Sequence, residues 1–214
     1  MKSYSHVTSK GKSLDLLLDS VFKHKENGFF IELGANDGLT QSNTALLEFY
    51  RGWKGVLVEP SFNAYTECSK NRPASTCFNL ACVSNTYEGD AIEGDFNGGM
   101  MSSVEGMRNG SSKLVSVKVS TLEKILDSVG ASSVDFLSLD TEGYELNILK
   151  GLNLSKYRPR YMLIEIYTKD YSEIVAFLNE NNYSLIMNMT NYNSVDNPQW
   201  DGTHNDYLFI DNSL

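Results

Sequence analysis

The sequence predicts an α/β fold in which a doubly wound, mostly parallel sheet carries helices on both faces. Short apolar runs that fit buried strands alternate with segments of helical spacing along most of the chain. One of these runs, residues 29–33, leads directly into a glycine-rich turn and then a helix. In open parallel sheets, such a strand–turn–helix unit holds a nucleotide-like ligand at the carboxyl edge of the strands.

The first half of the chain opens with a leading amphipathic helix within residues 1–28, because Leu14, Leu18 and Phe22 recur at helical spacing. After the strand at 29–33, Gly34 and Gly38 allow a tight turn, and Thr40, Ser42 or Asn43 can cap the next helix. The expected elements that follow are a helix at 45–50, a strand at 56–58, a helix at 62–70 and a strand at 76–82.

Residues 83–113 interrupt this rhythm. The segment is rich in glycine and methionine, which predicts an irregular insertion that forms an acceptor-site loop. Its markers are Gly89, Gly94, Gly98, Gly99, Met100, Met101, Gly106, Met107 and Gly110.

The second half returns to alternation, with an exposed strand at 114–119 and a helix at 122–129 capped by Ser120 or Thr121. The remaining expected elements are strands at 134–139 and 161–166, helices at 146–149 and 171–181, and a closing strand pair at 183–187 and 206–210. With 214 residues and no linker-like stretch, residues 1–214 are expected to form a single domain.

Composition excludes several classes of protein. A net charge of −9 argues against nucleic acid as a partner, because a basic surface is needed to neutralise phosphates. No apolar run approaches the ~20 residues that span a bilayer, and no signal segment is evident, so we expect a cytoplasmic protein. Cys68, Cys77 and Cys82 lack metal-ligand spacing, which indicates reduced, structural thiols.

Carboxylates close the first two strands. Glu32 precedes the glycine turn, and Glu59 ends the second strand about 20 residues later, where an acid can accept the hydroxyls of a ribose. A carboxylate beside the turn would repel a pyrophosphate but favour the sulfonium and ammonium groups of S-adenosylmethionine. This predicts S-adenosylmethionine as the cofactor. NAD remains a weaker alternative, since the sequence lacks G-x-G-x-x-G.

Further acids follow the later strands. Asp140 and Glu142 come after strand 134–139, and Glu165 lies in a strand whose burial would require a cation, a metal or a shared proton as its partner. Asp140, Glu165 and His204 are therefore the candidate catalytic residues, with Mg²⁺ on Asp140 and Glu165 as an alternative use. A purely structural alternative makes Asp140 a helix cap. His6 and His24 are expected at the surface, outside the site.

Three blocks of sequence resemble the FkbM-type methyltransferases, a family of class I enzymes that use S-adenosylmethionine to methylate hydroxyls. The blocks are Glu32-Leu-Gly-Ala-Asn-Asp-Gly-Leu-Thr-Gln-Ser-Asn-Thr44, Gly52-Trp-Lys-Gly-Val-Leu-Val-Glu-Pro60 and Leu137-Ser-Leu-Asp-Thr-Glu-Gly-Tyr-Glu145. The resemblance covers residues 29–209 and implies the Rossmann-like, seven-stranded methyltransferase sheet with an antiparallel last strand.

The resemblance also implies roles for individual residues. The methionine part of the cofactor would be held by Glu32, Gly34, Ala35, Asn36, Ser42 and Asn43. Glu59 would hold the ribose, Ala81 would border the adenine, and Asp140 and Glu142 would face the site of transfer.

The sequence thus predicts an S-adenosylmethionine-dependent O-methyltransferase that acts on a hydroxyl, most simply that of a sugar in a glycan or polysaccharide. Two alternatives remain open. One is a natural-product O-methyltransferase, and the other is a non-catalytic module on the same fold that binds nucleotides or glycans.

Overall fold

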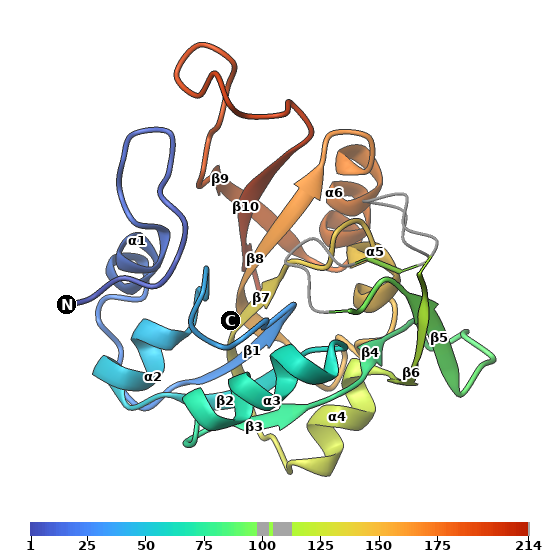
Figure 1. Cartoon of the computed structure of the whole chain (residues 1–214). Coiled ribbons are helices and arrows are strands. Elements are labelled where there is room, and N and C mark those ends of the chain that lie inside the picture. The colour runs from blue at the N-terminus through green and yellow to red at the C-terminus, as the bar shows by residue number, and fades with distance from the viewer. Residues whose placement is uncertain (98–102, 105–112, 214) are drawn as a thin grey trace.

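The computed structural model describes residues 1–97, 103–104 and 113–213. Its largest feature is a seven-stranded sheet with the strand order β3-β2-β1-β7-β8-β10-β9 (Figure 1). The strands of this sheet are β1 (Phe29–Leu33), β2 (Lys54–Val58), β3 (Thr76–Phe78), β7 (Val134–Leu139), β8 (Pro159–Tyr167), β9 (Tyr183–Asn188) and β10 (His204–Asp211).

Strand pairing confirms the predicted Rossmann-like topology. Neighbouring strands from β3 to β8 pair in parallel, whereas β10 runs antiparallel to both β8 and β9. The last strand of the chain is therefore the antiparallel one. The strand order reverses beside β1, because β2 and β3 lie on one side of it and β7 and β8 lie on the other. The loops that follow β1 and β7 therefore separate and can enclose a ligand.

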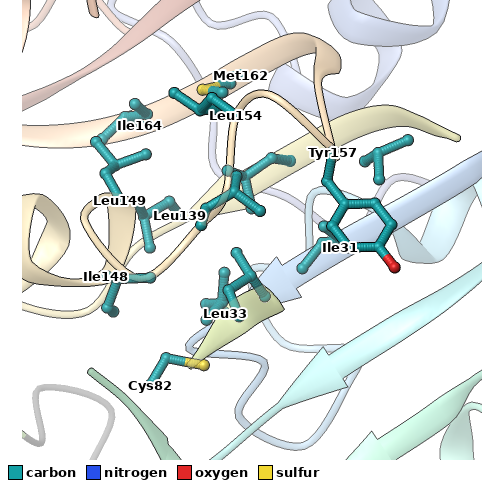
Figure 2. Packing of buried hydrophobic residues seen from close by; sticks show 14 of the residues in the cluster. Ile31, Leu33, Cys82, Leu139, Ile148, Leu149, Leu154, Tyr157, Met162 and Ile164 are labelled. Atoms are coloured by element: carbon teal, nitrogen blue, oxygen red, sulfur yellow. The ribbon is translucent and has the colours of Figure 1, made fainter. Parts of the chain in front are cut away.

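Six helices cover the two faces of the large sheet: α1 (Leu14–Val21), α2 (Ala45–Arg51), α3 (Phe62–Asn71), α4 (Leu122–Ser128), α5 (Glu145–Leu149) and α6 (Tyr171–Glu180). Strand side chains alternate between the faces, so each face has its own core. Phe30, Phe136 and Leu163 pack against α1, α2 and α3. On the other face, alternate residues of the same strands, including Ile31, Leu139 and Met162, pack against α4, α5 and α6, where Ile148 lies on α5 (Figure 2).

The predicted helix caps can be checked directly. The N-cap of α2 is Thr44 and none of the three predicted residues, although the Ser42 hydroxyl accepts the Ala45 N–H at 3.0 Å. Thr121 is the N-cap of α4, as predicted, and accepts the Lys124 N–H at 3.3 Å. Each hydroxyl satisfies a backbone donor at a helix start that has no partner within the helix. Within the described residues, no helix is both long and apolar enough to cross a membrane.

The region between the two halves differs from the prediction. The expected strand at 76–82 is broken into β3 and β4 (Ala81–Cys82), and β4 joins β5 (Ala91–Gly94) and β6 (Val115–Ser120) in a separate three-stranded sheet, at the right of Figure 1. The insertion is thus not wholly irregular, because β5 pairs antiparallel with β6. The predicted markers Gly98, Gly99, Met100, Met101, Gly106, Met107 and Gly110 lie outside the described residues.

Candidate functional site

A cleft opens at the carboxyl edge of β1, β2 and β7, where the loops that follow these strands converge. Eight of the ten residues predicted to bind the cofactor line it: Gly34, Ala35, Asn36, Ser42, Glu59, Ala81, Asp140 and Glu142. Of the predicted catalytic residues, Asp140 alone is in this lining. Most of the residues predicted to bind the cofactor therefore lie in the cleft wall.

The glycine turn is shaped by the protein's own backbone. Gly34 has φ +75°, and a Cβ on it would lie 1.9 Å from the carbonyl oxygen of Asp140. The glycine is thus needed for the close approach of the β1 turn to the β7 turn, before any ligand is considered. Asn36 also has a left-handed backbone, with φ +48°, which asparagine tolerates better than most residues.

Glu59, which the resemblance assigns to the ribose, lies in the lining of the cleft. Its Oε2 accepts the Asn36 N–H and its Oε1 accepts the Ser61 N–H, both at 2.8 Å. Burial raises the pKa of the Glu59 carboxyl, and the two backbone donors oppose that shift. Each carboxylate oxygen has a second lone pair, so Glu59 can fix the glycine turn and still accept hydrogen bonds from a sugar.

Glu32 and Asn43 lie behind the cleft and are not in its lining. Glu32 projects from the same face of β1 as Phe30, under α2. Its carboxylate accepts hydrogen bonds from the Thr44 hydroxyl at 2.6 Å and the Asn43 N–H at 2.8 Å. The Asn43 side chain turns to β7, where its Nδ2 donates to Ser138 at 3.0 Å. These two residues therefore support the turn that lines the cleft.

Arg72 explains how a buried carboxylate is tolerated there. Its guanidinium is fully buried and lies 3.4 Å from Glu32 and 3.0 Å from Glu48. It also donates to the Gly38 carbonyl at 3.0 Å, which ties the same network to the glycine turn. Glu32 lies behind the cleft and shares Arg72 with Glu48, so it does not present an unpaired charge to a ligand, as the argument for a cationic cofactor assumed.

The three predicted catalytic residues are neighbours. Parallel pairing of Leu139 with Ile164 places Asp140 beside Glu165 in the next row. The Nε2 atom of His204 lies 3.4 Å from Oε1 of Glu165. The antiparallel pairing of β8 with β10 adds Asp206, which lies opposite Glu165. We call Asp140, Glu165 and Asp206 the carboxylate row.

The three carboxyl groups of the carboxylate row all have raised pKa values. Burial raises the pKa of Asp140 well above its usual value, and the charges of Glu142, Asp206 and Glu145 raise it further. Burial is also the main cause of the raised pKa of Glu165, followed by the charge of Asp140. The pKa of Asp206 is raised by burial to about 6. Such a cluster holds protons or attracts a cation.

The turn after β7 is built by Glu145. Its buried carboxylate accepts the backbone N–H groups of Thr141 at 2.9 Å and Gly143 at 3.1 Å. This hydrogen bonding fixes the loop that follows Asp140 and leads into α5. The structural alternative for Asp140 is not found: the residue at the N-cap of α5 is Tyr144, and no described hydrogen bond makes Asp140 a cap.

A divalent cation would fit part of this cluster. Carboxylate oxygens of Asp140, Glu142 and Glu165 all lie within 4.8 Å of one another. Oε2 of Glu165 is buried and has no hydrogen-bond partner among the described residues. Carboxylate oxygens are the donors that Mg²⁺ prefers, so these three residues could hold it. Glu142 also accepts the Tyr167 hydroxyl at 2.6 Å.

One part of the cleft lining is apolar. It contains Ala81, Leu80, Phe96 and Val104, which gives a surface suited to the face of a purine. Phe96 and Val104 belong to the insertion, so this segment reaches the part of the cleft that is predicted to bind the adenine. The expectation that the insertion forms an acceptor wall is not tested by these contacts.

The two histidines that were expected at the surface, His6 and His24, differ in their exposure. His24 is exposed, as expected, and lies 2.7 Å from Asp19. His6, also expected at the surface, is half-buried, and its pKa is lowered by burial and by the charge of His204. The N-terminal segment therefore approaches the His204 side of the site.

Sequence reasoning missed Arg72, Asp206 and Glu145 as parts of the site. Alternation offered a signal for Asp206, because the residue lies two positions before the buried Leu208 and must share its face of the sheet. Arg72 carries no such signal. Its partner Glu32 is 40 positions away, and the end of a surface helix is an ordinary place for an arginine.

Comparison with known proteins adds two results on sequence. The model of the methyltransferase FkbM domain family matches residues 32–185 of this chain. No curated protein sequence gives a significant match.

Solved structures share the fold at low sequence identity. TrmK of M. capricolum, in complex with S-adenosyl-homocysteine, aligns with a TM-score of 0.54 and 11% identity over 92% of this chain and 68% of that chain. Fibrillarin of Aeropyrum pernix, with bound S-adenosyl-L-methionine, gives 0.50 and 13% over 91% and 74%. A methyltransferase of Geobacter sulfurreducens, with S-adenosyl-L-homocysteine, gives 0.50 and 9% over 98% and 92%. These alignments confirm the methyltransferase-type sheet.

Proposed function

This chain belongs to the FkbM methyltransferase family, and we propose on that premise that it transfers the methyl group of S-adenosylmethionine to a hydroxyl of a carbohydrate. One observation carries the proposal: Asp140 and Glu142 belong both to the wall of the cleft and to the acidic cluster. A methyl donor in the cleft would therefore end beside groups that can accept a proton.

The cofactor would lie along the cleft from its apolar end to the carboxylate row. Ala81 and its apolar neighbours would contact the adenine, and Glu59 would accept the ribose hydroxyls. The backbone of Gly34, Ala35 and Asn36 would contact the methionine part. The sulfonium would then face Asp140, whose negative surroundings favour a positive charge.

The transfer itself is a displacement at the methyl carbon. The acceptor oxygen forms a bond to the methyl carbon as the carbon–sulfur bond breaks, and the electron pair of that bond stays on sulfur. The hydroxyl proton passes to a carboxylate. Alignment of donor and acceptor contributes on the order of 7–11 kcal/mol, whereas a general base adds ~10²–10⁴-fold to the rate. We therefore assign the larger share to positioning.

Asp140 is the candidate base because it lines the cleft. Its raised pKa makes the ionised carboxylate a stronger base than an exposed aspartate, and a sulfonium beside it would favour the ionised form. Glu165 and His204 continue from it toward solvent, since the His204 side chain is 22% exposed. The proton would leave by this path.

A second role for the cluster is a divalent cation on Asp140, Glu142 and Glu165, favoured by the unpartnered Oε2 of Glu165. A bound cation would acidify an acceptor hydroxyl. Dialysis against EDTA separates the two roles. Loss of transfer that Mg²⁺ restores supports the cation, and undiminished transfer after dialysis supports the base.

Two measurements test the proposal. Isothermal titration with S-adenosylmethionine, S-adenosylhomocysteine and NAD should give binding of the first two alone. Transfer of a labelled methyl group to polysaccharides and to simple alcohols should then give base-stable ether products on the carbohydrate. Binding without transfer to any hydroxyl would favour the non-catalytic module, and binding of NAD alone would refute the assigned cofactor.

A further inference from the structure

Two thiols lie close together in a part of the molecule that the proposed reaction does not use. Cys68 lies on α3 and Cys77 on β3, and their sulfur atoms are 3.7 Å apart. Both are free thiols. Because a disulfide bond is about 2.05 Å long, the sulfurs need approach each other by only about 1.6 Å to bond.

The two thiols differ in access and in chemical character. Cys77 is half-buried on β3, which is an edge strand of the large sheet, whereas Cys68 is fully buried. A hydrogen bond from Cys68 lowers the pKa of Cys77 to about 7 against the opposing effect of burial, and the nearby Arg72 charge also lowers it. The same hydrogen bond and burial raise the pKa of Cys68. Cys77 is therefore the accessible nucleophile of the pair.

We propose that Cys68 and Cys77 form an oxidation site that reacts with peroxide and closes reversibly into a disulfide. The Cys77 thiolate attacks hydrogen peroxide, the O–O bond breaks, and a sulfenic acid and hydroxide are formed. The Cys68 sulfur then attacks the Cys77 sulfur, which releases the sulfenic oxygen as water with the Cys68 proton. Two thiols and one peroxide thus give one disulfide and two waters.

The pair lies against the glycine turn of the cleft. A Cβ on Gly38 would be 3.0 Å from the Cys68 sulfur, so this sulfur touches the turn. The end of the same helix holds the turn through Asn71, which donates to the Asp37 carbonyl at 2.9 Å, and through Arg72. Movement of the Cys68 sulfur to bond Cys77 would change its packing on this turn, so oxidation should weaken cofactor binding. This coupling rests on the proposed function.

Cys82 provides an internal control. It is buried, burial raises its pKa, and it has no sulfur neighbour among the described residues. Its thiol should survive a peroxide treatment that consumes the other two.

Intact mass measurement tests the site without any assay of activity. The protein is treated with hydrogen peroxide, denatured and alkylated with N-ethylmaleimide. Before alkylation, we expect the mass to fall by about 2 Da. After alkylation, only one of the three thiols should be labelled. Treatment with dithiothreitol before alkylation should restore both the mass and the labelling of all three thiols. Cys68→Ser and Cys77→Ser should each abolish the mass loss, and Cys82→Ser should retain it. Three labelled thiols after peroxide, or a mass loss that persists in Cys77→Ser, would overturn the proposal.

Titration with S-adenosylhomocysteine tests the coupling. Oxidised protein should bind about fivefold more weakly or worse, with recovery on reduction. Equal affinity in the two states would overturn the coupling to the turn. Absence of binding in the reduced protein would instead count against the proposed cofactor. The oxidation site would still stand, because the mass measurement does not depend on cofactor binding.

Discussion

Replacement of Arg72 by methionine should destabilise the protein strongly, because it leaves two buried carboxylates without a positively charged partner. The guanidinium is fully buried, and the side chains of Glu32 and Glu48 are 5% and 2% exposed. Methionine preserves much of the apolar stem but leaves both negative charges without their cation. Breaking a buried ion pair in this way costs about 3–5 kcal/mol.

The loss is measurable by urea denaturation and by thermal melting. For a chain of this size, 1 kcal/mol corresponds to about 2–4 °C, so the melting temperature of Arg72→Met should fall by about 6–20 °C. Lys70→Met is the matched control. Lys70 pairs with Glu67 on the same helix, but both side chains are more than half exposed, and the change should cost less than about 1 kcal/mol.

A double variant sharpens the test. Adding Glu48→Leu to Arg72→Met removes one stranded charge and should recover part of the lost stability. A loss below about 1 kcal/mol for Arg72→Met would refute the role of Arg72 as the counter-charge of this network. No recovery in the double variant would show that the loss comes from packing.

Three further predictions concern other parts of the molecule. Glu59→Ala should weaken S-adenosylmethionine binding by about 1.5–3 kcal/mol in isothermal titration, and unchanged affinity in a folded variant would remove Glu59 from the site. Asp140→Asn should cut methyl transfer at least ~10²-fold while stability stays within about 1 kcal/mol; full activity would exclude Asp140 as base or metal ligand. The pKa of Asp211 is lowered to about 2 by Arg158, a depression of the folded-state value. Its stabilisation, on the order of 2 kcal/mol, should therefore be present above pH 4 and be lost between about pH 4 and pH 2. Urea curves of the parent and Asp211→Asn should converge in that window, and a constant difference would contradict the assignment.

Much of the fold follows from periodicity alone. The central strands of the large sheet are mostly apolar because both of their faces are covered, as residues 29–33, 134–139 and 161–166 show. The small sheet was harder to predict. β4 and β5 have two and four residues, and neither contains enough alternation to be told from a loop.

The site was predicted where it depends on the ends of strands. Asp140, Glu165 and Glu59 are brought to one edge by the parallel topology, which the sequence pattern reveals. Glu32 was placed in the lining because its position along the chain was considered without the direction of its side chain. Glu32 lies two residues after Phe30, so strand alternation points both side chains toward α2. Its pairing with Arg72 could be found only from the three-dimensional structure.

The close approach of Gly34 to the Asp140 carbonyl has a consequence for how this enzyme can diversify. The turn proposed to hold the methyl donor and the residue proposed to receive the proton are in main-chain contact, so their relative alignment is independent of side-chain choice. Side chains that line the cleft can therefore change what it binds without moving the two turns relative to each other, whereas any residue larger than glycine at position 34 would push the β1 turn away from Asp140.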